Sequence, residues 1–123
     1  MNALEDRIKD LRQRYVQALP DRAASIGRML MQVPQRNITR AELLRQFHTL
    51  AGTAGTFGYE DIAALAREAE RVLSSAQAPD VTREEAERLV SGLVDLDVAI
   101  RRHLDAGGSY GPVCSTFEGG GVV

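Results

Sequence analysis

The chain contains two histidines, and His48 lies in a segment whose residue types and spacing could support chemistry. An exposed, neutral imidazole can attack an electrophile and hold a covalent group for a time. On a helical wheel at about 100° per residue, His48 falls roughly 140° from the apolar stripe of its segment. That stripe consists of Leu43, Phe47, Leu50, Ala54 and Phe57. We therefore expect His48 on the solvent side of a helix.

Small residues surround His48 on the same face of this predicted helix, namely Ala41, Ala51, Gly52 and Gly55. A glycine inside a helix costs about 1 kcal/mol relative to alanine, so two in one short helix are locally unfavourable. These glycines are unfavourable for helix formation, but they leave space around one imidazole. Such a departure from helix propensity indicates a functional site. If the electrophile is a phosphoryl group on another protein, such a face permits the two surfaces to come within bonding distance. The ordinary alternatives are a plain surface histidine and glycines that permit close helix packing.

Charged residues are available to serve this imidazole. Glu70, on the next predicted helix, can accept a hydrogen bond from Nδ1–H of His48 and leave Nε2 as the nucleophile. Arg45, three positions before His48, and Arg67, on the flank expected beside it, can stabilise a transferring phosphoryl group. The alternative for Arg67 and Glu70 is a solvated pair worth a few tenths of a kcal/mol. His103, near the end of the last predicted helix, is expected to be structural, because a cation suits that end of the helix dipole.

Five amphipathic helices are predicted to position these residues. Pro20 should end or sharply kink the first helix, because it lacks an N–H and clashes with the preceding turn. Capping boxes that begin at Thr39 and Thr82 predict the starts of the third and fifth helices. The apolar stripes are Leu4, Ile8, Leu11 and Tyr15; Ala23, Ile26, Leu30 and Val33; the stripe of the His48 segment; Ile62, Leu65, Ala69, Val72 and Leu73; and Ala86, Leu89, Leu93, Leu96, Ile100 and Leu104.

The fold class expected from these helices is all-α, an antiparallel four-helix bundle with one additional short helix. Residues 1–106 should form the bundle. Residues 107–123 begin with Gly107 and Gly108, which should end the last helix, and are expected to be a flexible Gly-rich tail or a linker to a following domain.

Composition excludes several other classes of protein. The 123 residues are 44% hydrophobic and 26% charged, with a net charge of −2, which argues against a basic nucleic-acid-binding surface. A single cysteine, Cys114, excludes an internal disulfide framework and a Cys-based zinc site.

No apolar run is long enough to span a bilayer, and the charged N-terminus has no signal-peptide core, so a cytoplasmic location is expected. Neither histidine has a glutamate three positions before it, so the ligand pairs of a carboxylate-bridged metal enzyme are missing. No metal or other cofactor is expected.

The segment HTLAGTAGTFG, residues 48–58, resembles the signature His-x-Leu-Lys-Gly-x-Ala-x-x-x-Gly of histidine-containing phosphotransfer (HPt) domains. Residues 65–70 are similar to the following helix of that family, and residues 18–22 resemble the break between its first two helices. The resemblance spans roughly residues 3–105. It implies a bundle in which His48 is phosphorylated, Gly52 clears room for the partner, and Glu70 orients the histidine. It also implies a partner, the receiver domain of a response regulator or hybrid histidine kinase.

Two functions remain open at this point. The first is a phosphoryl carrier without turnover of its own, as a monomer or as part of a larger signalling protein. The second is an HPt-like module that docks a receiver or other signalling protein without being phosphorylated. Ala51 favours the second, because the family usually has lysine at this position and the only lysine here is Lys9.

Overall fold

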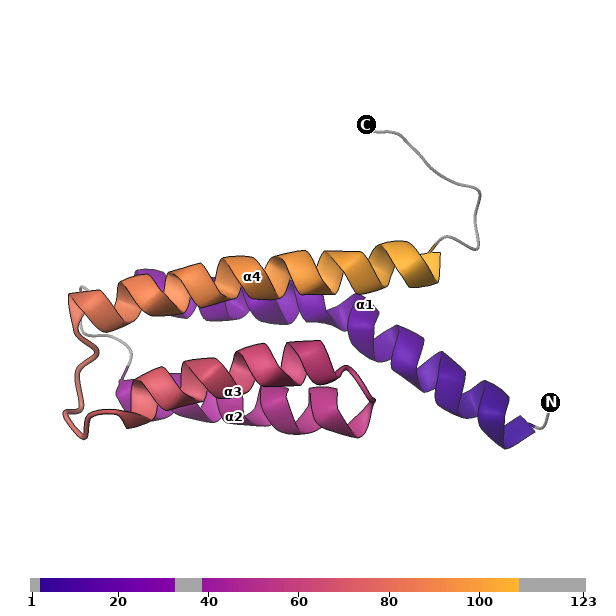
Figure 1. Ribbon diagram of the computed structural model, residues 1–123, viewed down its shortest axis with the longest axis horizontal. Helices are drawn as coiled ribbons and strands as arrows, with labels where there is room; N and C mark the ends of the chain where they lie inside the picture. The colour runs from indigo at the N-terminus through magenta and orange to yellow at the C-terminus, as the bar shows by residue number, and fades with distance from the viewer. Residues whose placement is uncertain (1–2, 33–38, 109–123) are drawn as a thin grey trace, which may run out of the picture.

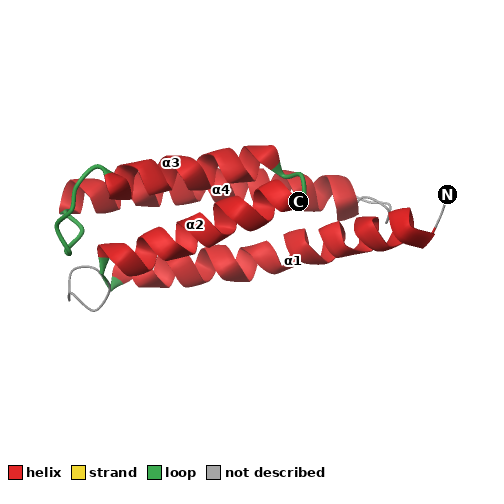
Figure 2. Ribbon diagram, turned by 90° about the horizontal axis from the view of Figure 1, so that it is seen from below, coloured by secondary structure: helices red, strands yellow, loops and turns green. Residues whose placement is uncertain are grey.

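The computed structural model describes residues 3–32 and 39–108, and these residues form four helices and no strand. The helices are α1 (Ala3–Met31), α2 (Arg40–Thr56), α3 (Glu60–Ser74) and α4 (Arg83–Gly108). In Figure 1, α3 and α4 lie in front of α2 and α1, and each helix runs opposite to the one before it. Figure 2, seen from below, shows the same two layers edge on. The all-helical class is confirmed.

The core is mostly aliphatic, as the lack of tryptophan and the low aromatic content predict, and Phe47 and Tyr59 are its buried aromatic residues. The stripes expected for the last three helices face this core, with Phe57, Leu65, Val72, Ala86, Leu93 and Leu104 partly buried at its edge. The residues that are least exposed and largest are Leu19, Ile26, Leu43, Phe47, Leu50, Ile62, Leu73, Leu89 and Leu96. Hydrophobic burial of these stripes therefore fixes which face of each helix is left for function.

The prediction that Pro20 separates two helices is wrong, because α1 continues through Pro20. A proline inside a helix costs about 3 kcal/mol, since one backbone hydrogen bond is lost and the ring crowds the preceding turn. Pro20 itself is exposed, while Leu19 and Ala23 on either side of it are buried in the core. Packing on both sides of the proline thus holds the helix together. The expected additional short helix is not found among the described residues, and Val33 of its stripe lies outside them.

The first turns of α1 do not join the core, although their apolar residues follow a helical stripe. Leu4, Ile8 and Leu11 are 65%, 49% and 45% exposed. Both ribbon views show these turns projecting beyond the C-terminal end of α2. We call residues 3–11 the N-terminal arm. Its base is held by Arg12, whose Nε donates to the carbonyl of Phe57 (2.7 Å), and by Tyr15, which stacks on the Phe57 ring.

The two predicted caps are present. Thr39 accepts a hydrogen bond from the Glu42 backbone N–H (3.2 Å) at the start of α2. At the start of α4 the capping box is reciprocal. The Glu85 N–H donates to the Thr82 hydroxyl (3.1 Å), and the Thr82 N–H donates to the Glu85 carboxylate (2.9 Å). Both helices therefore begin where their sequence signals place them.

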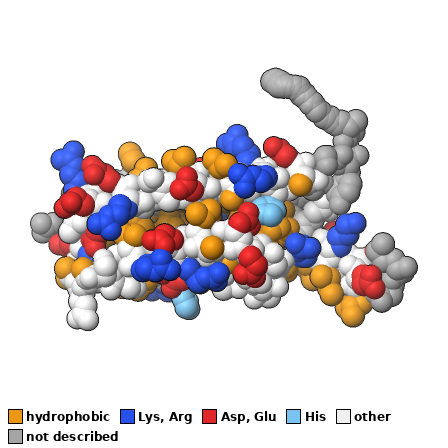
Figure 3. All heavy atoms as spheres, in the orientation of Figure 1, with side chains coloured by type: hydrophobic (Ala, Val, Ile, Leu, Met, Phe, Trp, Pro, Cys, Tyr) orange, Lys and Arg blue, Asp and Glu red, His pale blue; other side chains and the backbone are white. Residues whose placement is uncertain are grey.

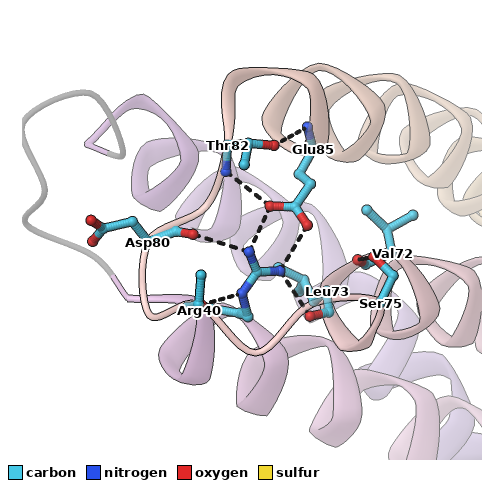
Figure 4. Close-up of polar contacts among 8 residues, drawn as sticks. Arg40, Val72, Leu73, Ser75, Asp80, Thr82 and Glu85 are labelled. Carbon is cyan, nitrogen blue, oxygen red and sulfur yellow. Dashed lines mark hydrogen bonds and ion pairs between the residues drawn. The ribbon is translucent and has the colours of Figure 1, made fainter.

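A buried ion pair joins α2 to α4, and no sequence pattern indicated it. The Arg40 guanidinium donates two hydrogen bonds to the Glu85 carboxylate, at 2.7 and 2.9 Å (Figure 4). It also donates to the backbone carbonyls of Leu73, Ala78 and Asp80. The hydrogen bonds from Arg40 outweigh the effect of burial and lower the pKa of Glu85 to about 2. One side chain thus fixes the start of α2 against both ends of the α3–α4 connection.

Candidate functional site

The site is built on the pair of helices α2 and α3, which a short turn connects. Gly58 adopts φ 84°, a conformation that glycine tolerates best, and the Tyr59 N–H then bonds back to the Ala54 carbonyl (2.8 Å). The apolar stripes of both helices are buried between them and the other two helices. The turn and the stripes together place one flank of α3 beside the exposed face of α2.

His48 lies on that exposed face, as its position on the helical wheel predicts. Its side chain is 78% exposed, and its Nδ1 is 2.8 Å from Oε2 of Glu70 on α3. An ionised carboxylate only accepts hydrogen bonds, so in the neutral imidazole the proton is on Nδ1, and this N–H donates a hydrogen bond to Glu70. The lone pair of Nε2 is then left free to act as a nucleophile.

The surface next to His48 is open. A Cβ atom added at Gly52 or at Gly55 meets no atom within 4 Å outside the local helix backbone. Packing within the described part of the chain therefore does not require either glycine. Ala51 differs from them, because it is 5% exposed and belongs to the core cluster. Ala51 therefore packs in the core beneath the site and does not form part of the open surface.

The two candidate cations do not contact the imidazole. Among the described residues, no hydrogen bond or ion pair joins His48 to Arg45 or to Arg67. Arg45 is exposed, one turn before His48. Arg67 is one turn before Glu70, and its guanidinium is 3.9 Å from the Glu60 carboxylate, with both side chains largely exposed. The structure thus brings His48 and Glu70 together and leaves both arginines on nearby turns.

Threonines near the site bond to backbone carbonyls of their own helix. The Thr53 hydroxyl is within hydrogen-bond distance of the Thr49 carbonyl (3.0 Å), and the Thr56 hydroxyl donates to the Gly52 carbonyl (2.9 Å). The Tyr15 hydroxyl also contacts the Thr53 hydroxyl (2.7 Å), which links α1 to this end of α2. These contacts satisfy the threonine hydroxyls within the described structure without compensating for the low helix propensity of the two glycines.

His103 has a structural partner that the sequence did not reveal. Its Nε2 is 2.9 Å from both carboxylate oxygens of Asp61, at the start of α3, and its ring packs edge-on against Tyr59. Burial raises the pKa of Asp61, but the hydrogen bonds from His103 and from the Ile62 N–H outweigh it, so that pKa is lowered overall. His103 therefore joins α4 to the α2–α3 turn. Asp61 and His103 are far apart in sequence, so no local pattern could pair them.

An exposed histidine that is hydrogen-bonded to a carboxylate on the neighbouring helix of an all-helical domain is an arrangement able to carry a covalent group. The family model for the Hpt domain matches residues 10–106, and the chain belongs to this family. Hpt domains are phosphocarrier modules of two-component phosphorelays in signal transduction. No curated protein and no solved structure matches the chain significantly. Among the described residues, no helix is both long enough and apolar enough to cross a membrane.

Proposed function

We propose that His48 carries a phosphoryl group to or from the active-site aspartate of a receiver domain. The observation that carries this proposal is the hydrogen bond from Nδ1 of His48 to Glu70 (2.8 Å) on an imidazole that is 78% exposed. Nε2 attacks the phosphorus atom of an aspartyl phosphate. The N–P bond forms as the P–O bond to the aspartate breaks, and the aspartate leaves as a carboxylate. The reverse reaction returns the group.

The open surface at Gly52 and Gly55 supports a partner of this kind. Phosphoryl transfer needs the two active sites within bonding distance, and side chains beside His48 would hold them apart. Both glycines lower the stability of the helix relative to alanine, and no close contact within the described residues requires a glycine at either position. We infer that they leave room for the receiver domain. Arg45 and Arg67 lie one turn before His48 and one turn before Glu70, and they are our candidates for stabilising the phosphoryl oxygens.

The carrier acts in this proposal without turnover of its own and without a cofactor. The functional unit is the helical part, proposed as residues 1–106, although α4 extends to Gly108. The remainder of the tail or linker proposed for residues 107–123 lies outside the described residues. The partner is the receiver domain of a response regulator or of a hybrid histidine kinase. Location in the cytoplasm, where such receivers act, and an antiparallel packing typical of HPt bundles belong to the same proposal.

The test mixes the chain with a receiver domain that carries labelled phosphate. We expect the label to move to the chain and to be labile in acid but stable in alkali, as a phosphoramidate is. His48→Gln should take up no label and should keep its stability within about 0.5 kcal/mol, because the side chain is exposed. His103→Gln is the matched control and should still be labelled. Equal labelling of His48→Gln would contradict the proposal.

A docking module without phosphorylation is the second candidate, and Ala51 favours it. The family usually has a lysine there, while here the position holds a buried alanine and the only lysine is Lys9. Receiver binding that persists in His48→Ala, with no label on the wild type, would select this function.

A further inference from the structure

A groove between α3 and α4 lies away from the His48 face. Its lining includes Ala64 and Leu65 from α3 and Val98 and Ala99 from α4. Val98 is 52% exposed although it is apolar. Figure 3 shows this face of the molecule, where hydrophobic side chains reach the surface between charged ones. The charged residues of its lining are Asp61, Glu68, Asp95 and Arg102.

The N-terminal arm carries an apolar stripe with a cation beside it, and these features are complementary to those of the groove. Leu4, Ile8 and Leu11 recur at the spacing of one helix face, and all three are exposed. Arg7 is one turn from Leu4 and one turn from Leu11, so its charge lies beside the stripe. Leu4 and Ile8 precede the segment that the Hpt family model matches.

The arm and the groove agree in length and in charge. Residues 4 to 11 and residues 95 to 102 each advance about 10 Å along a helix that rises 1.5 Å per residue. Within the described part of the chain, neither Arg7 nor Asp95 takes part in an ion pair. Glu68 already has Arg71 as a partner, and Asp61 has His103. One cation beside the arm's apolar stripe therefore matches one carboxylate beside the apolar groove.

The arm cannot reach the groove of its own chain. It continues the helix α1, whose following turn is held by the Arg12 bond to Phe57 and by the Tyr15 contact with Thr53. Both views show the arm extending past the C-terminal end of α2, and in Figure 1 it slopes away from α4. An occupant of the groove with the arm's chemistry must come from another molecule.

We propose that two copies of the chain associate by exchanging arms. The apolar stripe of each arm lies in the α3–α4 groove of the other copy, with Arg7 of one copy near Asp95 of the second. Reciprocal exchange forms a closed, twofold-symmetric dimer that buries both apolar faces at once. The His48 face stays open in this dimer, since Glu68 and Glu70 leave α3 in directions about 160° apart.

The experiment measures the molar mass of the full chain against concentration by sedimentation equilibrium. We expect a monomer–dimer equilibrium. Ile8→Asp in the arm and Val98→Asp in the groove should each weaken it by at least about tenfold. Val90→Asp is the matched control, because Val90 is an equally exposed valine (49%) two turns before Val98 on α4. All three positions are exposed, so the variants should keep their helix content, which circular dichroism checks.

Reversal of the charges tests the pairing itself. Arg7→Asp and Asp95→Arg should each weaken association, and the double variant should recover it. A single-chain mass at every concentration would overturn the proposal, as would equal loss in Val90→Asp and Val98→Asp. It would also fail if Ile8→Asp left the mass unchanged but slowed phosphotransfer, because the arm would then serve the receiver. His48→Gln should associate like the wild type, so this result is separate from the fate of the phosphotransfer proposal.

Discussion

A single hydrogen bond distinguishes His48 from an ordinary surface histidine. Exposure alone would leave its ring free to rotate and to carry its proton on either nitrogen. The Glu70 carboxylate, whose side chain is only 22% exposed, is 2.8 Å from Nδ1 and selects one tautomer and one orientation. The position of His48 on the helical wheel predicted its exposure, and the spacing of the next helix predicted its partner. The lack of contact between His48 and either Arg45 or Arg67 could not be predicted, because sequence patterns do not determine the conformations of exposed side chains.

Replacing Glu70 should slow phosphoryl transfer more than it lowers stability. A hydrogen bond to a charged group contributes about 1.5 kcal/mol, so Glu70→Ala should slow transfer about tenfold. Glu70→Gln should lose less, because its amide oxygen still accepts from Nδ1–H. Rapid-quench transfer from a phosphorylated receiver gives the rates, and nitrogen-15 NMR of the imidazole gives the tautomer. An unchanged rate and tautomer in Glu70→Ala would show that Glu70 does not position His48.

Helix α2 shows the conflict between local propensity and function most clearly. Its cap and its stripe of Leu43, Phe47, Leu50 and Ala54 agree with the sequence prediction. Its glycines disagree with helix propensity, and no neighbour in the described structure explains them. Pro20 in α1 is the opposite case. There the local signal predicted a break, and burial of Leu19 and Ala23 overrode it.

Filling the space at Gly52 should separate stability from function. Gly52→Ala should raise the free energy of unfolding by about 1 kcal/mol, because the helix gains propensity and the added Cβ meets nothing. Gly52→Leu should also fold but should slow transfer by at least about tenfold, since its side chain obstructs the receiver. Urea unfolding and transfer rates are the measurements.

Gly92 on α4 provides the control, because a Cβ there also meets nothing within 4 Å. Gly92→Ala should gain stability and keep the transfer rate. A similar rate for Gly52→Leu and the wild type would contradict the docking role of this surface.

On the scale of the whole molecule, the Arg40–Glu85 pair joins parts of the chain that the stripes do not connect. Sequence patterns identify which face of each helix is buried, and the all-helical class follows from them. They do not identify a charged residue that becomes buried only when the α3–α4 connection folds over it. Arg40 reads as part of a solvated helix start, yet it is 5% exposed. Long-range polar contacts of this kind, like that of Asp61 with His103, depend on the assembled fold.

This ion pair predicts sensitivity to acid. The folded-state pKa of Glu85 is about 2, below its ordinary value of 4.5, so its contribution is complete above pH 4.5. That contribution, roughly 3 kcal/mol, is lost as the pH falls from 4.5 toward 2. Glu85→Gln should lower stability at pH 7 by about 3 kcal/mol and should flatten the acid limb of a plot of stability against pH. Chemical unfolding at a series of pH values checks both effects. Parallel acid limbs for the two proteins would contradict the assignment.

The short turn between α2 and α3 has a consequence for motion. His48 and Glu70 both belong to residues 40–74, a helical hairpin whose closure needs only a small loop. Helix α1 packs mainly on α4, so transient detachment of α1 leaves the hairpin's own contacts in place. The imidazole of His48 then stays aligned with Glu70 while α1 transiently detaches. The proposed phosphoryl transfer therefore tolerates local opening of α1.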